Sequence, residues 1–206
     1  MGLREQKKSK RRHRVLEAAE ALFHERGFAG STISAVAARA DLAVGTVYNY
    51  FSSKDVLFVA VLKRELERLG ASDRVNPDLD APGFVMEAFS GVLSLVEIHG
   101  RELWFEFMMA VFHARRTLDE PVFELDWMLI QEIQDRLGFL RDQNRVVPGQ
   151  DLERASMVIF GCFLLRFQMY LMTKEVSIEL FRHELFADVE MIVNGLSITS
   201  GRSRNE

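Results

Sequence analysis

Hydrophobic residues recur every three or four positions along most of the chain, which is the spacing of amphipathic helices. In residues 1–70 this spacing predicts four helices. The first is expected to end at Gly27 in a left-handed cap. A second helix of about eight residues begins where Ser31 or Thr32 can cap it, and a third covers about 43–50. The fourth runs from the capped segment Ser52–Asp55 to Gly70.

The pattern beyond residue 70 is also helical. A polar segment with two prolines, 71–82, predicts a linker. No strand-like alternation or internal repeat follows it. We therefore predict an all-α fold of about nine helices, whose last five cover 84–99, 101–116, 121–144, 151–173 and 177–196.

The composition indicates a packed cytoplasmic protein, because 48% of the residues are hydrophobic and 27% are charged. The single cysteine, Cys162, excludes an intrachain disulfide and a cysteine zinc site, and its apolar neighbours predict a buried, inert thiol. No signal peptide is expected. The apolar run 155–165 ends at Arg166 and is shorter than the roughly 20 residues of a membrane helix, so no membrane partner is expected.

Charge is distributed unevenly along the chain. Residues 1–54 hold ten Lys/Arg and five Asp/Glu, a net charge of +5, whereas residues 55–206 hold 16 and 25, a net charge of −9. The basic residues concentrate in 1–14, which is either a frayed, solvated terminus or an arm that contacts a polyanion. A basic N-terminal segment on an otherwise acidic chain predicts that residues 1–54 bind an anionic partner.

Two short helices separated by a tight turn at Asp41, after a longer one, are typical of a helix-turn-helix DNA-binding domain, whose third helix enters the major groove. That helix carries short side chains that allow a close approach to the bases: Val44, Thr46, Val47 and Asn49. Tyr48 and Tyr50 offer hydroxyls to phosphates. The alternative is that these aromatic residues belong only to a small core. Phe51 is expected to pack inward, while Lys54, Thr32 and Ser34 lie at helix starts that favour phosphate.

Residues 10–60 resemble the DNA-binding domain of the TetR family of transcriptional regulators. The resemblance rests on segments in the right order and spacing: 15–23, 25–28, 32–33, 36–37, 40, 45–48, 50–51 and 54. It implies phosphate contacts from Thr32, Thr46, Tyr48, Tyr50 and Lys54. It implies base-facing positions at Val44, Gly45 and Asn49, with Ser34 as a further one. The chain departs from the family pattern at three positions. Asp41 stands where Gly is usual, Ala43 stands where Ser is common, and Val44 stands where a polar residue is frequent.

This resemblance implies a DNA-binding domain at 1–54, with the basic arm 1–14, and a C-terminal regulatory and dimerisation domain at 55–206, joined through helix 54–70 and linker 71–82. In the family, the C-terminal helices usually form a ligand pocket. Aromatic and Met residues here form either a plain core or a pocket for an apolar or amphipathic small-molecule effector. The expected pocket residues are Trp104, Phe107, Met108, Phe112, His113, Trp127, Phe163 and Phe167.

The last two helices carry long apolar stripes, which predict a homodimer with a four-helix seam. The expected interface residues are Ile159, Phe163, Phe181, Leu185, Val189, Ile192 and Leu196. We expect a ligand-responsive repressor that binds a near-palindromic double-stranded DNA operator, with no cofactor and no metal. The alternatives are a helical small-molecule-binding enzyme, for which no catalytic motif is found, and a regulator controlled by a protein partner.

Overall fold

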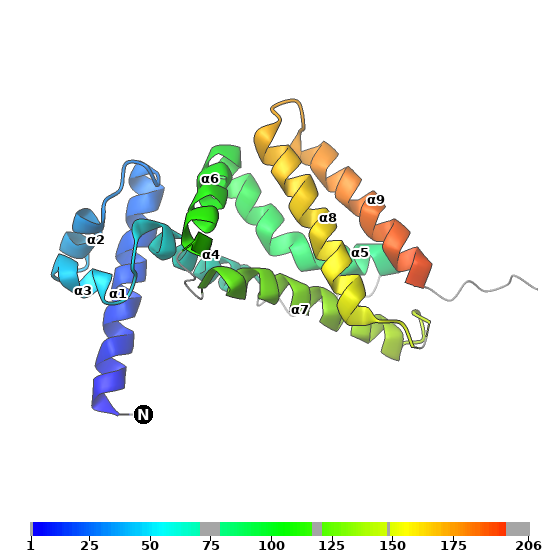
Figure 1. The fold of residues 1–206 in the computed structure, drawn as a ribbon, viewed down its shortest axis with the longest axis horizontal. Coiled ribbons are helices and arrows are strands. Elements are labelled where there is room, and N and C mark those ends of the chain that lie inside the picture. The colour runs from blue at the N-terminus through cyan, green and yellow to red at the C-terminus, as the bar shows by residue number, and fades with distance from the viewer. Residues whose placement is uncertain (1, 71–78, 117–120, 148, 197–206) are drawn as a thin grey trace, which may run out of the picture. The chain divides into compact units, whose positions relative to one another are not determined.

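The computed structural model describes residues 2–70, 79–116, 121–147 and 149–196, in which helices alternate with turns and loops and no strand occurs (Figure 1). The fold is therefore all-α, as predicted. The helices are α1 (Leu3–Arg26), α2 (Ile33–Arg39), α3 (Val44–Tyr48), α4 (Lys54–Gly70), α5 (Ala81–Met86), the 3₁₀ turn η1 (Glu87–Phe89), α6 (Ser90–Arg116), α7 (Pro121–Asp142), α8 (Leu152–Met172) and α9 (Ile178–Leu196).

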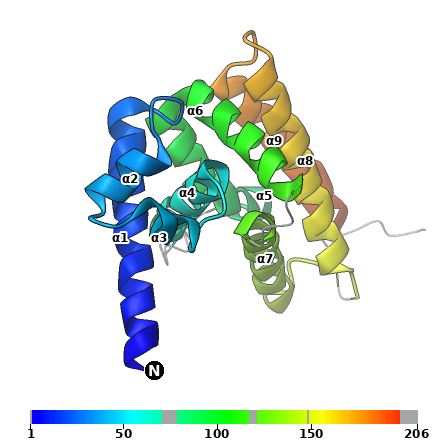
Figure 2. The ribbon, with the colours of Figure 1, turned by 60° about the vertical axis from the view of Figure 1, so that its left-hand side comes forward.

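The chain divides into two compact units. The first contains residues 1–71 and 95–125, and the second contains 72–94 and 126–206. In the first unit, α1 packs against α2 and α4, and α2 packs against α3 (Figure 2). In the second unit, α9 packs against α5 and α8. The predicted boundary at residue 54 stays a prediction, and most of the predicted linker lies outside the described residues.

Several helix ends follow local chemistry that the sequence predicts. Thr32 caps α2 by accepting a hydrogen bond from the Ala35 N–H at 3.1 Å, and Ser53 Oγ accepts one from the Val56 N–H at the start of α4. Gly100, with φ of 77°, breaks the helical backbone inside α6. The two helices expected on either side of this glycine are thus confirmed as two helical segments.

Three local expectations were wrong. The frayed terminus, one of the two alternatives for residues 1–14, is wrong, because α1 is helical from Leu3 onward. The third helix is shorter than 43–50 and covers only five residues, Val44–Tyr48. Gly27 ends α1 with a positive φ of 71°, but its ψ of 171° lies outside the left-handed helical region.

Two helical segments, Ala81–Phe112 and Leu152–Met172, are by length and composition long and apolar enough to cross a membrane. The sequence alone had indicated only the shorter apolar run 155–165. Core helices of soluble proteins meet the same two criteria. In these segments, 50% and 44% of the most apolar window is buried inside the protein. In α8 the interior contacts include an aromatic stack, in which the Phe163 ring lies 4.7 Å from Phe89 and 5.4 Å from Phe167.

Candidate nucleic-acid interface

The turn between α2 and α3 is held by its own backbone and by α1. Asp41 has φ of 52°, in the left-handed region that aspartate tolerates in turns. The Leu42 N–H donates to the Ala37 carbonyl at 3.0 Å and closes the end of α2. The Arg14 guanidinium of α1 donates to the Ala40 carbonyl and to the Asp41 carboxylate, the latter at 3.2 Å. Asp41 therefore gains an ionic partner where glycine would offer only conformational freedom.

The inward face of α3 fixes the helix to its bundle. Phe51 is 2% exposed, as predicted for a residue that packs inward. Val47, expected among the short side chains that approach the groove, is instead fully buried. Arg12 of α1 lies over the Phe51 ring at 5.3 Å from its centroid. Burying the two side chains is worth about 1.5–3 kcal/mol each. This burial positions a helix that is too short to be stable alone.

The outward face of α3 presents the residues predicted to meet DNA. Tyr48 is 51% exposed and Val44 is 39% exposed, and Gly45 and Asn49 are also exposed. A Cβ at Gly45 would meet no atom within 4 Å, so this face is open for a close approach. Thr46 of α3 and Tyr50, two residues after its end, are half-buried.

The basic start of α1 lies beside the end of α3. Lys8, Asn49 and Tyr50 line one shallow cleft of about 470 Å³ together with Glu5. The cationic side chains of α1 between Lys7 and Arg14 are exposed to solvent. The positive charge of 1–14 is thus carried on a helix near the candidate DNA-contacting face, and an extended chain is not needed to bring it there.

The start of α2 belongs to the same bundle as α3. Thr32 and Ser34 are both exposed, and α2 packs directly on α3. Lys54, expected to contact phosphate, is engaged within the protein. Its ammonium donates to the carbonyl oxygens of Phe28 at 3.0 Å and Ser31 at 3.2 Å, and it lies 4.0 Å from the Phe28 ring centroid. The Lys54 side chain thus fixes the loop that leads into α2.

The predicted ligand-pocket residues divide between the two units. Trp104, Phe107, Met108 and Phe112 belong to the first unit, where Trp104 and Phe107 are buried and meet edge to face at 5.2 Å. Phe163 and Phe167 belong to the second and are at most 3% exposed, in the aromatic stack with Phe89. Trp127 is 54% exposed. The side chain of His113 lies outside the described residues.

Five of the seven predicted interface residues lie inside the core of the second unit. These five are at most 3% exposed, because α8 and α9 turn these faces toward each other: Ile159, Phe163, Phe181, Leu185 and Val189. Ile192 and Leu196 are half-buried. Arg166, which ends the apolar run of α8, pairs with Asp188 of α9 at 2.7 and 3.0 Å and with Glu184 at 2.9 Å.

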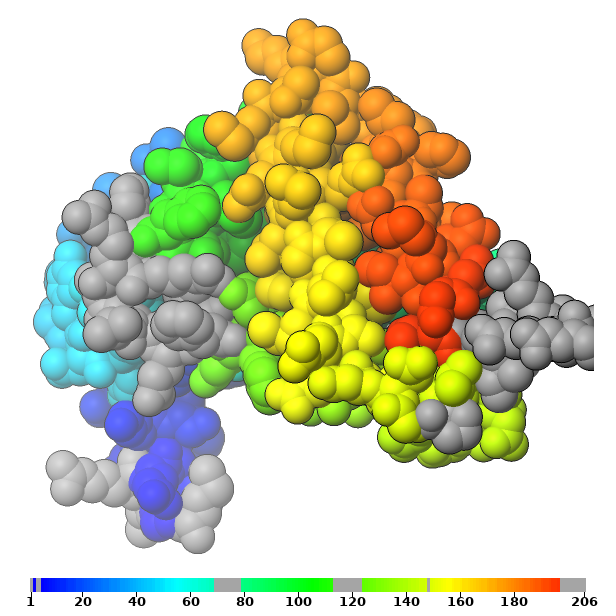
Figure 3. All heavy atoms as spheres, turned by 45° about the vertical axis from the view of Figure 1, so that its right-hand side comes forward, coloured from blue at the N-terminus to red at the C-terminus, as the bar shows by residue number. Residues whose placement is uncertain are grey.

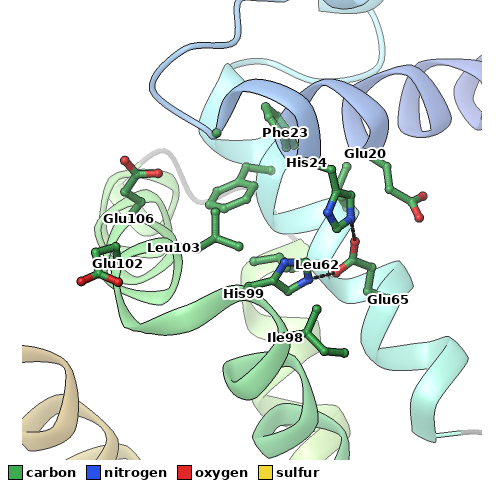
Figure 4. A pocket seen from close by; sticks show the side chains of 13 residues that line it. Glu20, Phe23, His24, Leu62, Glu65, Ile98, His99, Glu102, Leu103 and Glu106 are labelled. Atoms are coloured by element: carbon green, nitrogen blue, oxygen red, sulfur yellow. Dashed lines mark hydrogen bonds and ion pairs between the residues drawn. The ribbon is translucent and has the colours of Figure 1, made fainter.

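Sequence reasoning missed one cluster in the first unit. His24, Glu65 and His99 come together in a cleft of about 460 Å³ whose apolar lining includes Phe23, Phe58 and Leu62 (Figure 4). The three residues are 41 and 34 positions apart along the chain, so no local spacing could have indicated them.

Comparison with known proteins agrees with this geometry. A family model described as "Bacterial regulatory proteins, tetR family" matches residues 15–61. The HTH-type transcriptional repressor KstR of Rhodococcus jostii RHA1 is 30% identical over 157 residues, which are 75% of this chain and 69% of KstR.

Solved structures match over nearly the whole fold. A TetR transcriptional regulator from Rhodococcus sp. RHA1 aligns with a TM-score of 0.72 and 24% identity over 92% of this chain and 99% of its own. Thermus thermophilus FadR, a repressor solved with lauroyl-CoA, aligns with a TM-score of 0.64 and 20% identity over 95% of this chain and all of its own. With the helix-turn-helix geometry and the match to KstR, these findings show that the chain belongs to the TetR family and is a DNA-binding transcriptional regulator.

Proposed function

We propose that the chain is a ligand-responsive repressor that binds a near-palindromic operator as a dimer. The outward face of α3 carries this proposal. It combines exposed Val44, Gly45, Tyr48 and Asn49 with a rigid inward face and a basic neighbouring helix. A short helix with open glycine and mostly short side chains fits the major groove, and the cations of α1 favour the phosphates beside it.

Within this proposal, side-chain hydroxyls contact phosphates and the centre of α3 faces the bases. The phosphate contacts come from Thr32, Thr46, Tyr48 and Tyr50. Lys54 contributes through the backbone N–H groups at the first turn of α4, because its ammonium is engaged by two carbonyls. The base-facing positions are Ser34, Val44, Gly45 and Asn49.

Base recognition is expected to rely on apolar contacts and DNA shape. Ala43 and Val44 bring no hydrogen-bonding side chain to the start of α3, and Asn49 is the main polar group at its end. Val44 can contact thymine methyl groups. Val44→Ala should therefore weaken the preference for operator over random DNA. An unchanged preference would remove Val44 from base recognition.

The dimer is proposed to form through the outer faces of α8 and α9, which lie side by side in Figure 3. Large apolar side chains remain exposed there: Val158, Leu165, Met169 and Met172 on α8, and Leu180 and Met191 on α9. Spacings of three to seven residues on α8 and of eleven on α9 keep each set on one helix face. Gly161 is exposed on the same face of α8. A second copy covers this surface, and its own α3 binds the second half-site of the operator.

The effector is proposed to be an apolar or amphipathic small molecule. The FadR relative holds lauroyl-CoA, an amphipathic ligand, which supports this class. Of the residues predicted to line a pocket, Met108 and Phe112 are accessible in the first unit and Trp127 in the second, whereas Phe163 and Phe167 are already packed. Effector and DNA oppose each other through one coupling free energy, typically about 1–3 kcal/mol. We further propose a cytoplasmic, non-enzymatic protein, in keeping with relatives named as transcriptional repressors.

The test is a titration of the purified chain into labelled DNA from the region beside its own gene, at two salt concentrations. Gly45→Ala is the test variant, because the added methyl would stand between α3 and the groove. Gly138→Ala is the matched control, since its Cβ is equally unobstructed on α7. We expect specific, salt-sensitive binding by the wild type and the control, and a loss of about tenfold or more in Gly45→Ala. Equal binding to random DNA by all three proteins would contradict the proposal.

A further inference from the structure

Three potential metal ligands from three different helices meet in the first unit. Glu65 of α4 lies between His24 of α1 and His99 of α6, as Figure 4 shows. His24 Nε2 is 3.1 Å from one carboxylate oxygen of Glu65, and His99 Nε2 is 3.0 Å from the other. The two imidazole rings are 4.9 Å apart between centroids. One ligand atom from each residue lies within 4.8 Å of the other two.

The cluster is accessible on one side and enclosed on the other. The side chains of Glu65 and His99 are 11% and 10% exposed, whereas that of His24 is 49% exposed. The cleft beside them is lined by further carboxylates from Glu20, Glu102 and Glu106. This arrangement gives two ligands a fixed position and lets an ion enter past His24 from an acidic cleft.

We propose that His24, Glu65 and His99 bind a divalent transition-metal ion of the Zn²⁺ type. Two imidazoles and one carboxylate match the ligand preference of Zn²⁺, for which tetrahedral bonds of about 2.0–2.1 Å place neighbouring ligand atoms about 3.3 Å apart. Each imidazole Nε2 is already close to that distance from a Glu65 oxygen, at 3.1 and 3.0 Å. The two nitrogens use different oxygens, so the carboxylate must rotate to present one oxygen to the ion. A small approach of the imidazoles completes three corners of a tetrahedron, and a water from the cleft takes the fourth.

The ion would connect the helix that scaffolds α3 to two other helices. α1 carries His24 in its last turn, and its Arg14 holds the turn before α3. Metal binding therefore restrains α1 against α4 and α6 within this unit. The inference does not depend on the proposed repressor function, because its readout is binding of the ion itself.

The metal site and a purely hydrogen-bonded cluster differ in the protonation of the imidazoles. Hydrogen bonds to the Glu65 carboxylate require each Nε2 to carry its proton, whereas metal ligation requires both Nε2 atoms to be free of it. Nitrogen chemical shifts of the two histidines thus distinguish the two states. In the metal-bound state both Nε2 resonances move away from those of a protonated nitrogen.

The experiment uses the full chain, stripped of metal with a chelator, and titrates it with Zn²⁺ by calorimetry and with Co²⁺ by visible absorption. We expect one ion per chain and, at 100 times the dissociation constant, a rise in Tm of about 5–10 °C. His24→Gln and Glu65→Gln should each weaken Zn²⁺ binding more than about 100-fold, beyond the range of outer-shell changes. His183→Gln, a surface histidine of the second unit, is the control and should bind as the wild type does.

Two results would overturn the site. One is fewer than one ion bound per chain at micromolar free Zn²⁺, with the Nε2 resonances unchanged. The other is equal affinity in the wild type, His24→Gln and Glu65→Gln, which would put the ion elsewhere. Exposed His24 is replaceable without loss of the fold, so circular dichroism and Tm of His24→Gln confirm that any lost binding reflects the missing ligand.

Discussion

Helices α3 and α8 both expose large apolar side chains, yet their surroundings differ in every other respect. α3 has five residues and exposes Val44 and Tyr48 to solvent. A glycine, side-chain hydroxyls and the basic start of α1 lie close to these two residues. α8 has 21 residues and exposes a long stripe that includes Leu165 at 60% and Met172 at 77%.

This difference separates two kinds of binding surface. An exposed ring and methyl groups among cations and hydroxyls suit the major groove of DNA. There the phosphates meet the cations and hydroxyls, and thymine methyl groups meet the apolar side chains. An apolar stripe along a long helix suits another apolar stripe, because its burial against water is the main gain. Exposure of hydrophobic residues alone therefore does not identify the partner.

The largest effect is expected from placing a charge on the α8 stripe. Leu165→Arg should leave the fold intact, since this side chain is 60% exposed, but it should prevent a second copy from covering the surface. Sedimentation should show a monomer, and operator affinity should fall more than about 100-fold as only one half-site is read. Gln150→Arg, in an exposed loop, is the control. A dimeric Leu165→Arg would remove this surface from the interface.

A smaller effect is expected at Tyr48 on α3. Removing a hydroxyl that meets phosphate should cost about 1.5–3 kcal/mol, or about 10–100-fold in DNA affinity. Tyr48→Phe and Tyr48→Ala should lose similar amounts if the hydroxyl makes the contact, and both should remain dimers. Fluorescence anisotropy with operator DNA measures the loss. Full affinity in Tyr48→Phe with a loss in Tyr48→Ala would assign the role to the ring instead.

The turn before α3 should respond in stability. Asp41 has φ of 52°, which a β-branched residue tolerates poorly, so Asp41→Val should lower the free energy of unfolding by about 1–3 kcal/mol. Asp41→Gly avoids this strain and loses only an exposed ion pair with Arg14. Urea denaturation compares the two variants. Equal stability of the Val and Gly variants would show that the turn imposes no conformational demand.

The smallest effect concerns Cys162 on α8. Burial raises the pKa of this thiol, with a further contribution from the Asp188 charge. A raised pKa leaves less reactive thiolate at a given pH. Alkylation by iodoacetamide at pH 8 should thus be slower than for a free cysteine peptide and should rise with pH. A rate equal to that of the peptide would place the thiol in water.

The sequence predicted α3 better than α8 for a physical reason. Phe51 is the large apolar residue at the end of this short segment, and its inward packing followed from the sequence. Val44 and Val47 are alike in the sequence, and only the structure shows that Val47 is buried while Val44 is exposed. α8 is apolar on most sides, and its period does not distinguish the face that meets α9 from the outer face. Phe163 and Ile159 were therefore expected at a dimer interface, whereas both lie in the chain's own core.

Long-range clusters set another limit on sequence reasoning. The His24–Glu65–His99 group depends on how α1, α4 and α6 pack, and no helical spacing encodes that packing. The Lys54 ammonium is a related case. Its place at a helix start indicated a phosphate contact, but the carbonyls that hold it belong to a loop more than 20 residues earlier in the chain.

The most direct test of the account is the mass of the protein–DNA complex in solution, measured by sedimentation velocity with labelled operator DNA. If α3 reads a half-site and the α8–α9 face joins two copies, each duplex should take up two copies of the 23.6 kDa chain together, with no one-chain complex at intermediate ratios. One chain per duplex, or no specific complex, would contradict the claim that this chain reads its operator as a dimer.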